Sequence, residues 1–275
     1  MSRTAPLDHI MFVVNNLQAT QASYTRLGFT VMPRMTHSEL GTSNQIIVLQ
    51  STYIEFIGDL ANARKRIADR LSPRLRFGDG ITMMCLGTNS IHDELSRLTC
   101  EGINPDKVQS ARRTVSLPSG SIDQTDSHFF YTRNPVHPFL SFFFCQHNRP
   151  DLIWIQDFQT HPNTAEEITG VVIVSDDLEA DRAYFEACLT IYSTSQKQVS
   201  DFEFYDWAEF PSIYTSLLTL TDRPAGFTCG VKVRVASIHA CRSRLLKNAV
   251  TFIDGNDHIL VSASVAHGAF ILFHE

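Results

Sequence analysis

A histidine and a glutamate stand inside otherwise apolar runs of the 275-residue chain. His9 lies in Leu7–Val14, and Glu55 lies in Tyr53–Ile57. A carboxylate in an apolar strand costs free energy unless it is paired, hydrogen-bonded or bound to a metal. A neutral imidazole is a common ligand for Zn, Fe, Ni or Mn. The two residues predict a metal site or an acid–base site, although a strand-edge histidine with one hydrogen bond is the simpler interpretation of His9.

A polar segment follows at 37–44, where His37, Thr42 and Asn44 provide an imidazole, a hydroxyl and an amide. Gly41 allows the backbone to turn with a positive φ. One interpretation is a polar clamp for a carbonyl or hydroxyl group of a substrate. The simpler one is a turn whose side chains bond to one another.

A long polar insert, Asp106–Ser127, carries two adjacent arginines and the turn residues Pro118-Ser119-Gly120. We expect a surface loop that could serve as a lid. Arg113 could hold a carboxylate through its fork-shaped guanidinium group. A solvated pair, Arg112 with Arg113, is the simpler interpretation.

The elements that must position these residues recur four times along the chain. Each unit opens on a short apolar run, continues with an amphipathic segment and ends in further strand-like runs. The second and fourth units share a literal Ser-Ile-His, at Ser90–His92 and Ser237–His239. The four openings are Asp8–Val14, Ile81–Gly87, Ile168–Val174 and Gly230–Val235.

The later runs of each unit predict its remaining strands. They are Thr30–Arg34, Asn44–Leu49 and Tyr53–Ile57 in unit one, Phe129–Thr132 and Phe139–Cys145 in unit two, Phe202–Trp207 and Tyr214–Thr219 in unit three, and Thr251–Ile253, His258–Ser262 and Ala269–His274 in unit four. The pattern predicts an α+β protein of four βαβββ units. We expect a first domain at 1–148 (units 7–58 and 80–147), a linker at 149–164 and a second, degenerate domain at 165–275.

Paired βαβββ units, together with LDHIMFVVNNL at Leu7–Leu17 and YIEFIG at Tyr53–Gly58, resemble the vicinal oxygen chelate superfamily. The chain is most similar to its glyoxalase-like branch, which also has a His…Gly-Thr-x-Asn run like that at 37–44. The resemblance implies two cup-shaped domains of the glyoxalase and bleomycin-resistance kind. It further implies a divalent metal (Zn, Fe, Ni or Mn) in a cup, bound by the first and last strands of each unit.

Carried over to this chain, the resemblance assigns His9 and Glu55 as metal ligands, with Glu55 also the base. The second unit departs from the pattern, because the matching positions fall on Thr82 or Met83 and near Phe143. Cys145 and His147 share the strand face of Phe143 and could replace the missing ligands or touch a substrate. A core thiol and a surface imidazole are the simpler interpretations. The matching positions of the second domain, Gly170, Val231 and Leu272, offer no ligand, and we expect no metal there.

The leading functional hypothesis is a metal-dependent enzyme, of isomerase, lyase or dioxygenase type, acting on a small molecule with vicinal oxygens. The alternative is a metal-free binding protein of the bleomycin-resistance type, and a third possibility is an interaction or pseudo-enzyme module. A homodimer is compatible with each of these readings. The missing ligands of unit two favour the alternatives, whereas the polar pair in apolar strands favours the enzyme.

The charge and composition of the chain limit the kinds of partner that it is expected to bind. The formal charge of −6 comes with no large basic cluster, which argues against nucleic acid. The chain has no run of 18 apolar residues, so we expect no membrane span. The N-terminus has no apolar signal region, so we expect a cytoplasmic protein. The six cysteines have no CxxC spacing and are expected to be mostly core thiols.

Overall fold

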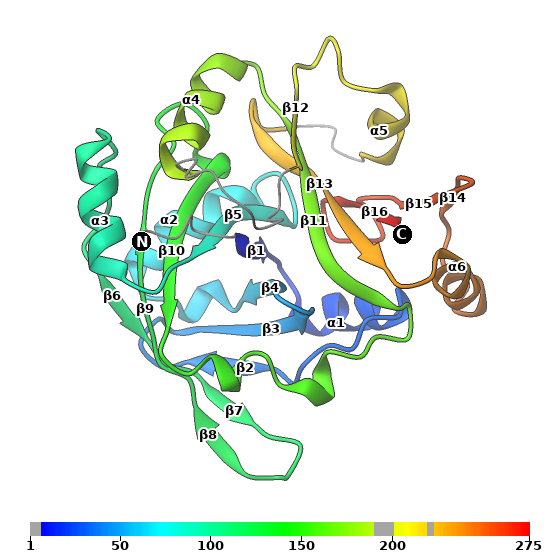
Figure 1. Ribbon diagram of the computed structural model, residues 1–275, viewed down its shortest axis with the longest axis horizontal. Helices are drawn as coiled ribbons and strands as arrows, with labels where there is room; N and C mark the ends of the chain where they lie inside the picture. Colours follow the sequence, from blue (N-terminus) through cyan, green and yellow to red (C-terminus); the bar gives the residue numbers. More distant parts are fainter. Residues whose placement is uncertain (1–6, 190–200, 219–222) are drawn as a thin grey trace.

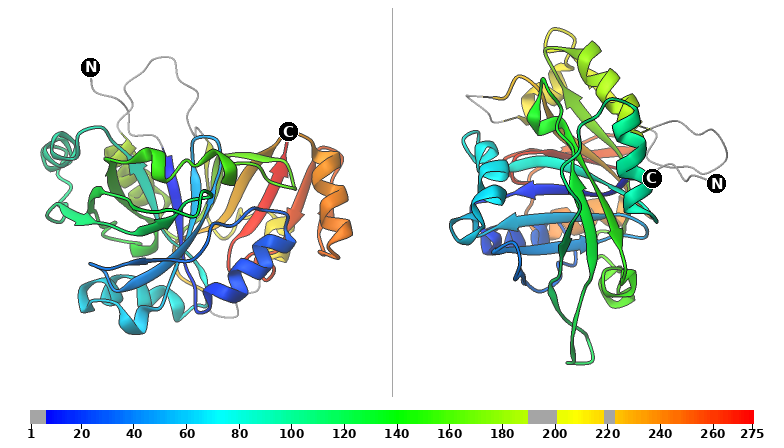
Figure 2. Two further views of the ribbon diagram at one scale, coloured as in Figure 1. Left: turned by 90° about the horizontal axis from the view of Figure 1, so that it is seen from below. Right: turned by 90° about the vertical axis from the view of Figure 1, so that its left-hand side faces the viewer.

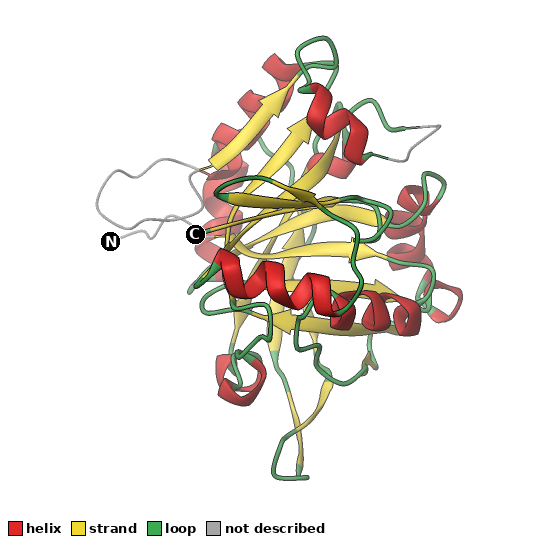
Figure 3. Cartoon of the chain, turned by 90° about the vertical axis from the view of Figure 1, so that its right-hand side faces the viewer, coloured by secondary structure: helices red, strands yellow, loops and turns green. Residues whose placement is uncertain are grey.

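A computed structural model describes residues 7–189, 201–218 and 223–275. Two curved sheets and the helices beside them form a mixed α+β fold (Figure 1). The expected cup-shaped architecture is confirmed. Figure 3 shows the strands in the interior and the helices along the sides of the molecule. The N-terminal residues 1–6 and the last residue of the expected strand Tyr214–Thr219 lie outside the described ranges.

The first sheet has eight strands in the order β2-β3-β4-β1-β5-β10-β9-β6. These strands are β1 (Leu7–Val13), β2 (Met35–His37), β3 (Thr42–Val48), β4 (Tyr53–Gly58), β5 (Gly80–Gly87), β6 (Gln109–Ala111), β9 (Ser127–Tyr131) and β10 (Ser141–His147). Helices α1 (Leu17–Arg26), α2 (Lys65–Leu75) and α3 (Ile91–Cys100) connect them. The hairpin β7 (Thr114–Ser116) and β8 (Ile122–Gln124) projects away from the body (Figure 2).

The strand order shows two equivalent units placed back to back. In each unit the first strand pairs in parallel with the last, β1 with β4 and β5 with β10. The two first strands, β1 and β5, pair antiparallel and join the units at the centre of the sheet. This topology is the one expected for paired βαβββ units.

The second sheet repeats the central arrangement with six strands in the order β12-β11-β13-β16-β15-β14. The elements of this half are β11 (Ala165–Val174), α4 (Leu178–Leu189), β12 (Asp201–Tyr205), α5 (Ser212–Leu217), β13 (Phe227–Val235), α6 (Ile238–Lys247), β14 (Ile253–Asp254), β15 (His258–Val261) and β16 (Phe270–His274). Strands β11 and β13 pair antiparallel, as β1 and β5 do. Within the described residues, the third unit contributes only two strands to this sheet.

The repeated Ser-Ile-His marks the same structural position in two units. Ser90 and Ser237 are the N-cap residues of α3 and α6, and the Ser237 side chain accepts a hydrogen bond from the Ala240 amide. A hydroxyl at this position satisfies one of the free N–H groups of a helix start. Gly28, just after α1, has a φ of 87°, the left-handed conformation in which helices commonly end.

Successive side chains of β1 point to opposite faces of the sheet and belong to two different cores. His9 and Met11 face the concave side of the first sheet, which we call the first cup. Ile10 and Phe12 face the other side, where they share one buried cluster with Val171 of β11 and other residues of the second sheet. The two halves are therefore packed through a common core. The domain boundaries at 148 and 165 stay a prediction.

Two expected strands are wrong. Thr30–Arg34 is irregular, because Pro33 has no N–H to donate, and β2 begins only at Met35. Tyr214–Thr219 overlaps helix α5, which starts directly after Pro211. A proline before the first helical residue suits a helix start, and Tyr214, the aromatic residue of the expected strand, stacks on Phe270 from the helix. Across the described ranges, no helix has the length and apolar character needed to cross a membrane.

Candidate functional site

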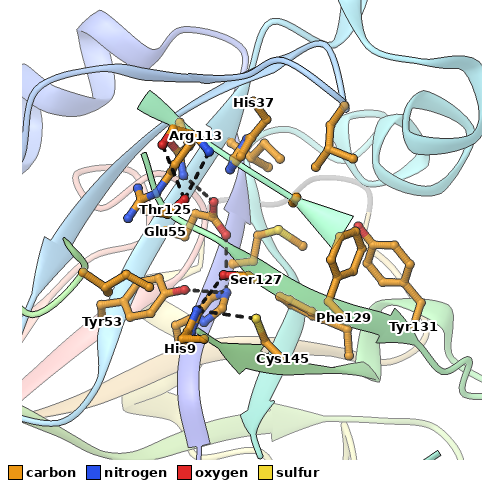
Figure 4. A pocket seen from close by; sticks show the side chains of 18 residues that line it. His9, His37, Tyr53, Glu55, Arg113, Thr125, Ser127, Phe129, Tyr131 and Cys145 are labelled. Carbon is orange, nitrogen blue, oxygen red and sulfur yellow. Dashed lines mark hydrogen bonds and ion pairs between the residues drawn. The ribbon is translucent and has the colours of Figure 1, made fainter. Parts of the chain in front are cut away.

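The first cup contains a pocket with about 620 Å³ of empty space, including its open mouth. Figure 4 shows side chains from the sheet and from the β6–β7 segment pointing into it. Its polar lining residues are His9, His37, Asn44, Tyr53, Glu55, Arg113, Thr125, Ser127, Cys145 and His147. Its apolar wall includes Met11, Leu40, Ile57, Phe129, Tyr131 and Phe143. An apolar wall with a few convergent polar groups is typical of a small-molecule site.

His9 and Glu55 meet inside this pocket. The distance from His9 Nε2 to Glu55 Oε2 is 3.3 Å, and both side chains are buried. Asp8 Oδ1 lies 2.7 Å from His9 Nδ1, and Asn44 Nδ2 donates to Glu55 Oε1 at 2.6 Å. A second group thus orients each member of the pair.

Electrostatics favour the ionised form of this pair. Burial alone would raise the pKa of Glu55, but the hydrogen bond and charge of His9 lower it to about 2. Burial alone would lower the pKa of His9, but hydrogen bonds to Asp8 and Glu55 raise it. The surroundings of the pair therefore favour the charged form of His9 and the ionised form of Glu55.

His37 and Thr42 bond to each other, since His37 Nδ1 lies 3.1 Å from Thr42 Oγ1. Burial lowers the pKa of His37 to about 4, so its ring is neutral near pH 7. His37 lines the pocket with Asn44, whereas Thr42 does not line it. The self-bonded turn is therefore present, the polar clamp stays a prediction, and Gly41 has the expected positive φ of 73°.

Arg113 is buried in the cup, so the interpretation of a solvated arginine pair is wrong for this residue. Its backbone pairs with that of His37 and with Thr125, which draws the segment across the sheet. Arg113 NH1 is buried without a hydrogen-bond partner. Arg112 beside it is exposed. The insert is therefore partly a wall of the pocket rather than a surface loop alone.

The His147 side chain is also largely buried, so the expected surface imidazole is wrong. Its Nε2 lies 3.1 Å from Asp8 Oδ1, and its Nδ1 lies 3.7 Å from Cys145 Sγ and 3.0 Å from Ser127 Oγ. Cys145 faces the pocket from the same side of β10 as Phe143, with no slip of register.

The four-ligand metal centre of the superfamily does not fit these residues. His9 and Glu55 occupy the two ligand positions of the first unit, but the corresponding positions of the second unit carry Met83 and Phe143, which offer no ligand for a hard divalent ion. Among described residues, three ligand-type side chains come close together only at Asp8, His9 and Cys85, and the first two already bond to each other. The Arg113 cation shares the same cup.

The pocket also contains residues that the pattern did not single out. Asp8 and Tyr53 adjoin the key pair, and Tyr53 stacks on His9 with ring centroids 4.0 Å apart. Asp8 could have been found, because it is a second charged residue in the same apolar strand as His9. Ser127, Phe129 and Tyr131 come from β9, and no local signal links that strand to the first unit.

Known proteins share this fold. Residues 7–188 match the family model described as Glyoxalase-like domain. No curated protein matches the chain by sequence. A hypothetical protein from Staphylococcus aureus has a similar structure over 98% of each chain, with 14% identity and a TM-score of 0.67.

Two further solved structures are similar. A variant of 4-hydroxymandelate synthase from Streptomyces coelicolor aligns over 98% of this chain and 92% of its own, with 10% identity and a TM-score of 0.62. A Mn(II)-bound glyoxalase from Novosphingobium aromaticivorans aligns over 99% and 82%, with 10% identity and a TM-score of 0.55. At these identities the likeness concerns the fold alone.

Proposed function

The chain belongs to the glyoxalase-like domain family, and from that premise we propose that its first cup binds a small carboxylic acid with an adjacent carbonyl oxygen and moves a proton next to that carbonyl. Such a molecule has vicinal oxygens, as substrates of the superfamily do. The reaction class is isomerase or lyase chemistry without a metal. The observation that carries the proposal is the His9–Glu55 ion pair beside the unpartnered guanidinium of Arg113.

Arg113 supports the choice of an anionic substrate. A buried guanidinium N–H without a partner costs free energy, and a carboxylate that accepts from it removes this cost. Asn44 Oδ1 is likewise buried without a partner and could accept from a substrate hydroxyl. Both groups line the pocket that contains Glu55, so a bound acid would lie beside the base.

The proton transfer follows from the ionisation of the pair. Glu55 is a carboxylate at neutral pH and can accept a proton from the carbon next to the carbonyl. His9 is its charged neighbour and can donate to the carbonyl oxygen on which negative charge develops. Asp8 and Asn44 hold the two groups in place for these roles.

Exchange of substrate protons for deuterium tests this proposal. A 2-oxo acid such as 2-oxobutanoate is incubated with the protein in D₂O, and loss of the proton signal beside the carbonyl is followed by NMR. We expect catalysed exchange that Glu55→Gln reduces by at least about 100-fold. Arg113→Gln should raise the concentration of 2-oxobutanoate that gives half-maximal exchange, whereas Arg112→Gln should behave as wild type. No exchange above the buffer rate for any small 2-oxo acid contradicts the proposal.

A metal-dependent enzyme is the second candidate, and one observation favours it. Asp8 on His9 and Asn44 on Glu55 are partners of the kind that orient metal ligands in proteins. In that case His9 and Glu55 would be two ligands, and water or substrate would complete the shell. Metal content of the purified protein separates the two candidates.

A further inference from the structure

Two contacts at the first cup, one between Cys145 and His147 and one between His147 and Asp8, have no part in the proposed proton transfer. Cys145 Sγ lies 3.7 Å from His147 Nδ1, and His147 Nε2 lies 3.1 Å from Asp8 Oδ1. Asp8 and Cys145 are buried, His147 is partly buried, and Cys145 and His147 line the pocket. The imidazole contacts the thiol through one ring nitrogen and the carboxylate through the other. This is the arrangement of an activated nucleophile.

We propose that Cys145 is a nucleophile that adds to an electrophilic carbonyl carbon of a molecule bound in the first cup. His147 takes the thiol proton, and Asp8 is a positioning residue that holds the imidazole by its other nitrogen.

Strand geometry fixes this arrangement. Cys145 and His147 are two positions apart on β10 and so point to the same side of the sheet. Asp8 comes from β1 and reaches His147 across β5, which lies between the two strands. Because the contacts bind two different units of the sheet, they do not depend on the conformation of a loop.

The electrostatic environment agrees with this geometry. A hydrogen bond with Cys85, together with the charge of His147, lowers the pKa of Cys145 although burial opposes the shift. Burial disfavours the charged form of His147, but the charges of Cys145 and Asp8 raise its pKa. The titratable and charged groups that face Cys145 from the surrounding elements are Asp8, His9, Tyr53, Glu55, Cys85, Arg113 and His147.

The chemical step is balanced without a further reactant. The Cys145 sulfur forms a bond to the carbonyl carbon while the π bond of the carbonyl breaks and its electrons move to oxygen. That oxygen takes the proton held by His147, and the product is a hemithioacetal, or its ketone equivalent, on Cys145. The reverse step releases the molecule and returns the proton to His147.

A second observation points to a ligand at this place. Arg113 NH1 is unpartnered and buried in the pocket that Cys145 lines, and the charge of each affects the other. The nucleophile does not rest on the proposed proton transfer, because it involves neither Glu55 nor the acidity of a substrate. A neutral electrophile therefore tests it alone.

Competitive alkylation by iodoacetamide, read out for each cysteine by mass spectrometry, provides this test. Cys100 is exposed and is the accessible reference thiol, while the buried Cys188 and Cys229 must stay unlabelled in the native protein. At pH 6 we expect Cys145 to react about tenfold faster than Cys100, because the contact with His147 activates its sulfur. Between pH 6 and 8 the rate at Cys145 should change little, whereas that of N-acetylcysteine, added as a free thiol, rises steeply with its thiolate fraction.

The variants His147→Gln and Asp8→Asn keep the size of the side chains and separate activation from access. In His147→Gln, the rate at Cys145 should fall at least tenfold at pH 6 and should then rise steeply between pH 6 and 8. Asp8→Asn should also lower the alkylation rate at Cys145, but by a smaller factor than His147→Gln does. If wild-type Cys145 reacts no faster than Cys100, or if His147→Gln leaves its pH profile unchanged, the proposal is overturned. Iodoacetate is negatively charged, and its rate relative to iodoacetamide separately measures whether Arg113 attracts anions to the pocket. Equal rates for the two reagents would contradict only the anion-binding proposal.

Discussion

His9 and Glu55 stand 3.3 Å apart in the first cup, and each has its own buried hydrogen-bonding partner. The parallel pairing of β1 with β4 places His9 opposite Tyr53 and Met11 opposite Glu55. Glu55 therefore lies one step along the same strand face from His9. The contact is a direct consequence of the βαβββ topology, in which the first and last strands of a unit are neighbours.

Removing the charge of Glu55 should change the titration of His9. Hydrogen bonds to Asp8 and Glu55 raise the pKa of His9 against the effect of burial. In Glu55→Gln one of these two carboxylates is lost, so the pKa of His9 should fall. NMR titration of the imidazole carbons measures it. A Glu39→Gln variant, which alters a partly exposed carboxylate outside the pair, is the control. An unchanged His9 pKa in Glu55→Gln would mean that the pair does not form.

Arg113 should control the binding of small acids. Loss of one charged hydrogen bond costs about 1.5–3 kcal/mol, which corresponds to a loss of affinity of roughly 10- to 100-fold. Arg113→Gln should therefore weaken binding of 2-oxobutanoate by that factor in calorimetry. Arg112→Gln removes the same charge at an exposed neighbouring position and should leave affinity unchanged. Equal losses in both variants would indicate a general charge effect instead of a specific contact.

His37 should make the protein less stable in mild acid. Its pKa in the folded protein, about 4, lies below the ordinary value of 6.5. Between these values the unfolded chain binds more protons, so the free energy of unfolding falls as the pH falls. Between pH 7 and pH 5 the free energy of unfolding should therefore fall by about 2 kcal/mol more in the wild type than in His37→Asn.

Urea unfolding at both pH values measures this difference. His92→Asn, at an exposed position on α3, is the control and should lose as much as the wild type. Parallel pH profiles for the wild type and His37→Asn would contradict the burial of a neutral imidazole in the cup.

The shared core should couple the two halves of the chain. Tyr184 of α4 donates or accepts at 2.6 Å with Thr132 and accepts from the Phe142 amide at 3.0 Å. Tyr184→Phe leaves the buried Phe142 amide without a partner, while Thr132 still donates to the Phe142 carbonyl, and it should lower the free energy of unfolding by about 2 kcal/mol in a single transition. Tyr214→Phe, at a partly exposed ring in the second half, should cost much less. Two separate transitions, with only the second half destabilised, would show that the halves fold independently.

The repeating pattern of the sequence predicted the parts of the fold that depend on local periodicity. The apolar openings and the Ser-Ile-His caps became first strands and helix starts. Thr30–Arg34 and Tyr214–Thr219 were wrong, since apolar and aromatic content alone cannot separate a strand from an irregular segment or a short helix. Pro33 and Pro211 were the local signals that could have corrected both.

The candidate site was predictable only in part. His9 and Glu55 stood out because a polar group in an apolar strand needs a partner, and strand pairing supplied it. Arg113 could not be placed, because its burial depends on how the β6–β7 segment crosses the sheet. The contact between Asp8 and His147 joins residues far apart in the sequence, and no spacing rule reports such a contact.

Metal content tests the central claim most directly. The wild type and His9→Ala are purified without added metal or chelator and measured by plasma mass spectrometry, with 2-oxobutanoate binding recorded before and after EDTA treatment. We expect far less than one equivalent of any transition metal in both proteins, and binding that EDTA does not change. Close to one equivalent in the wild type, lost in His9→Ala and accompanied by loss of binding after EDTA, would contradict this expectation and establish the metal-dependent enzyme instead.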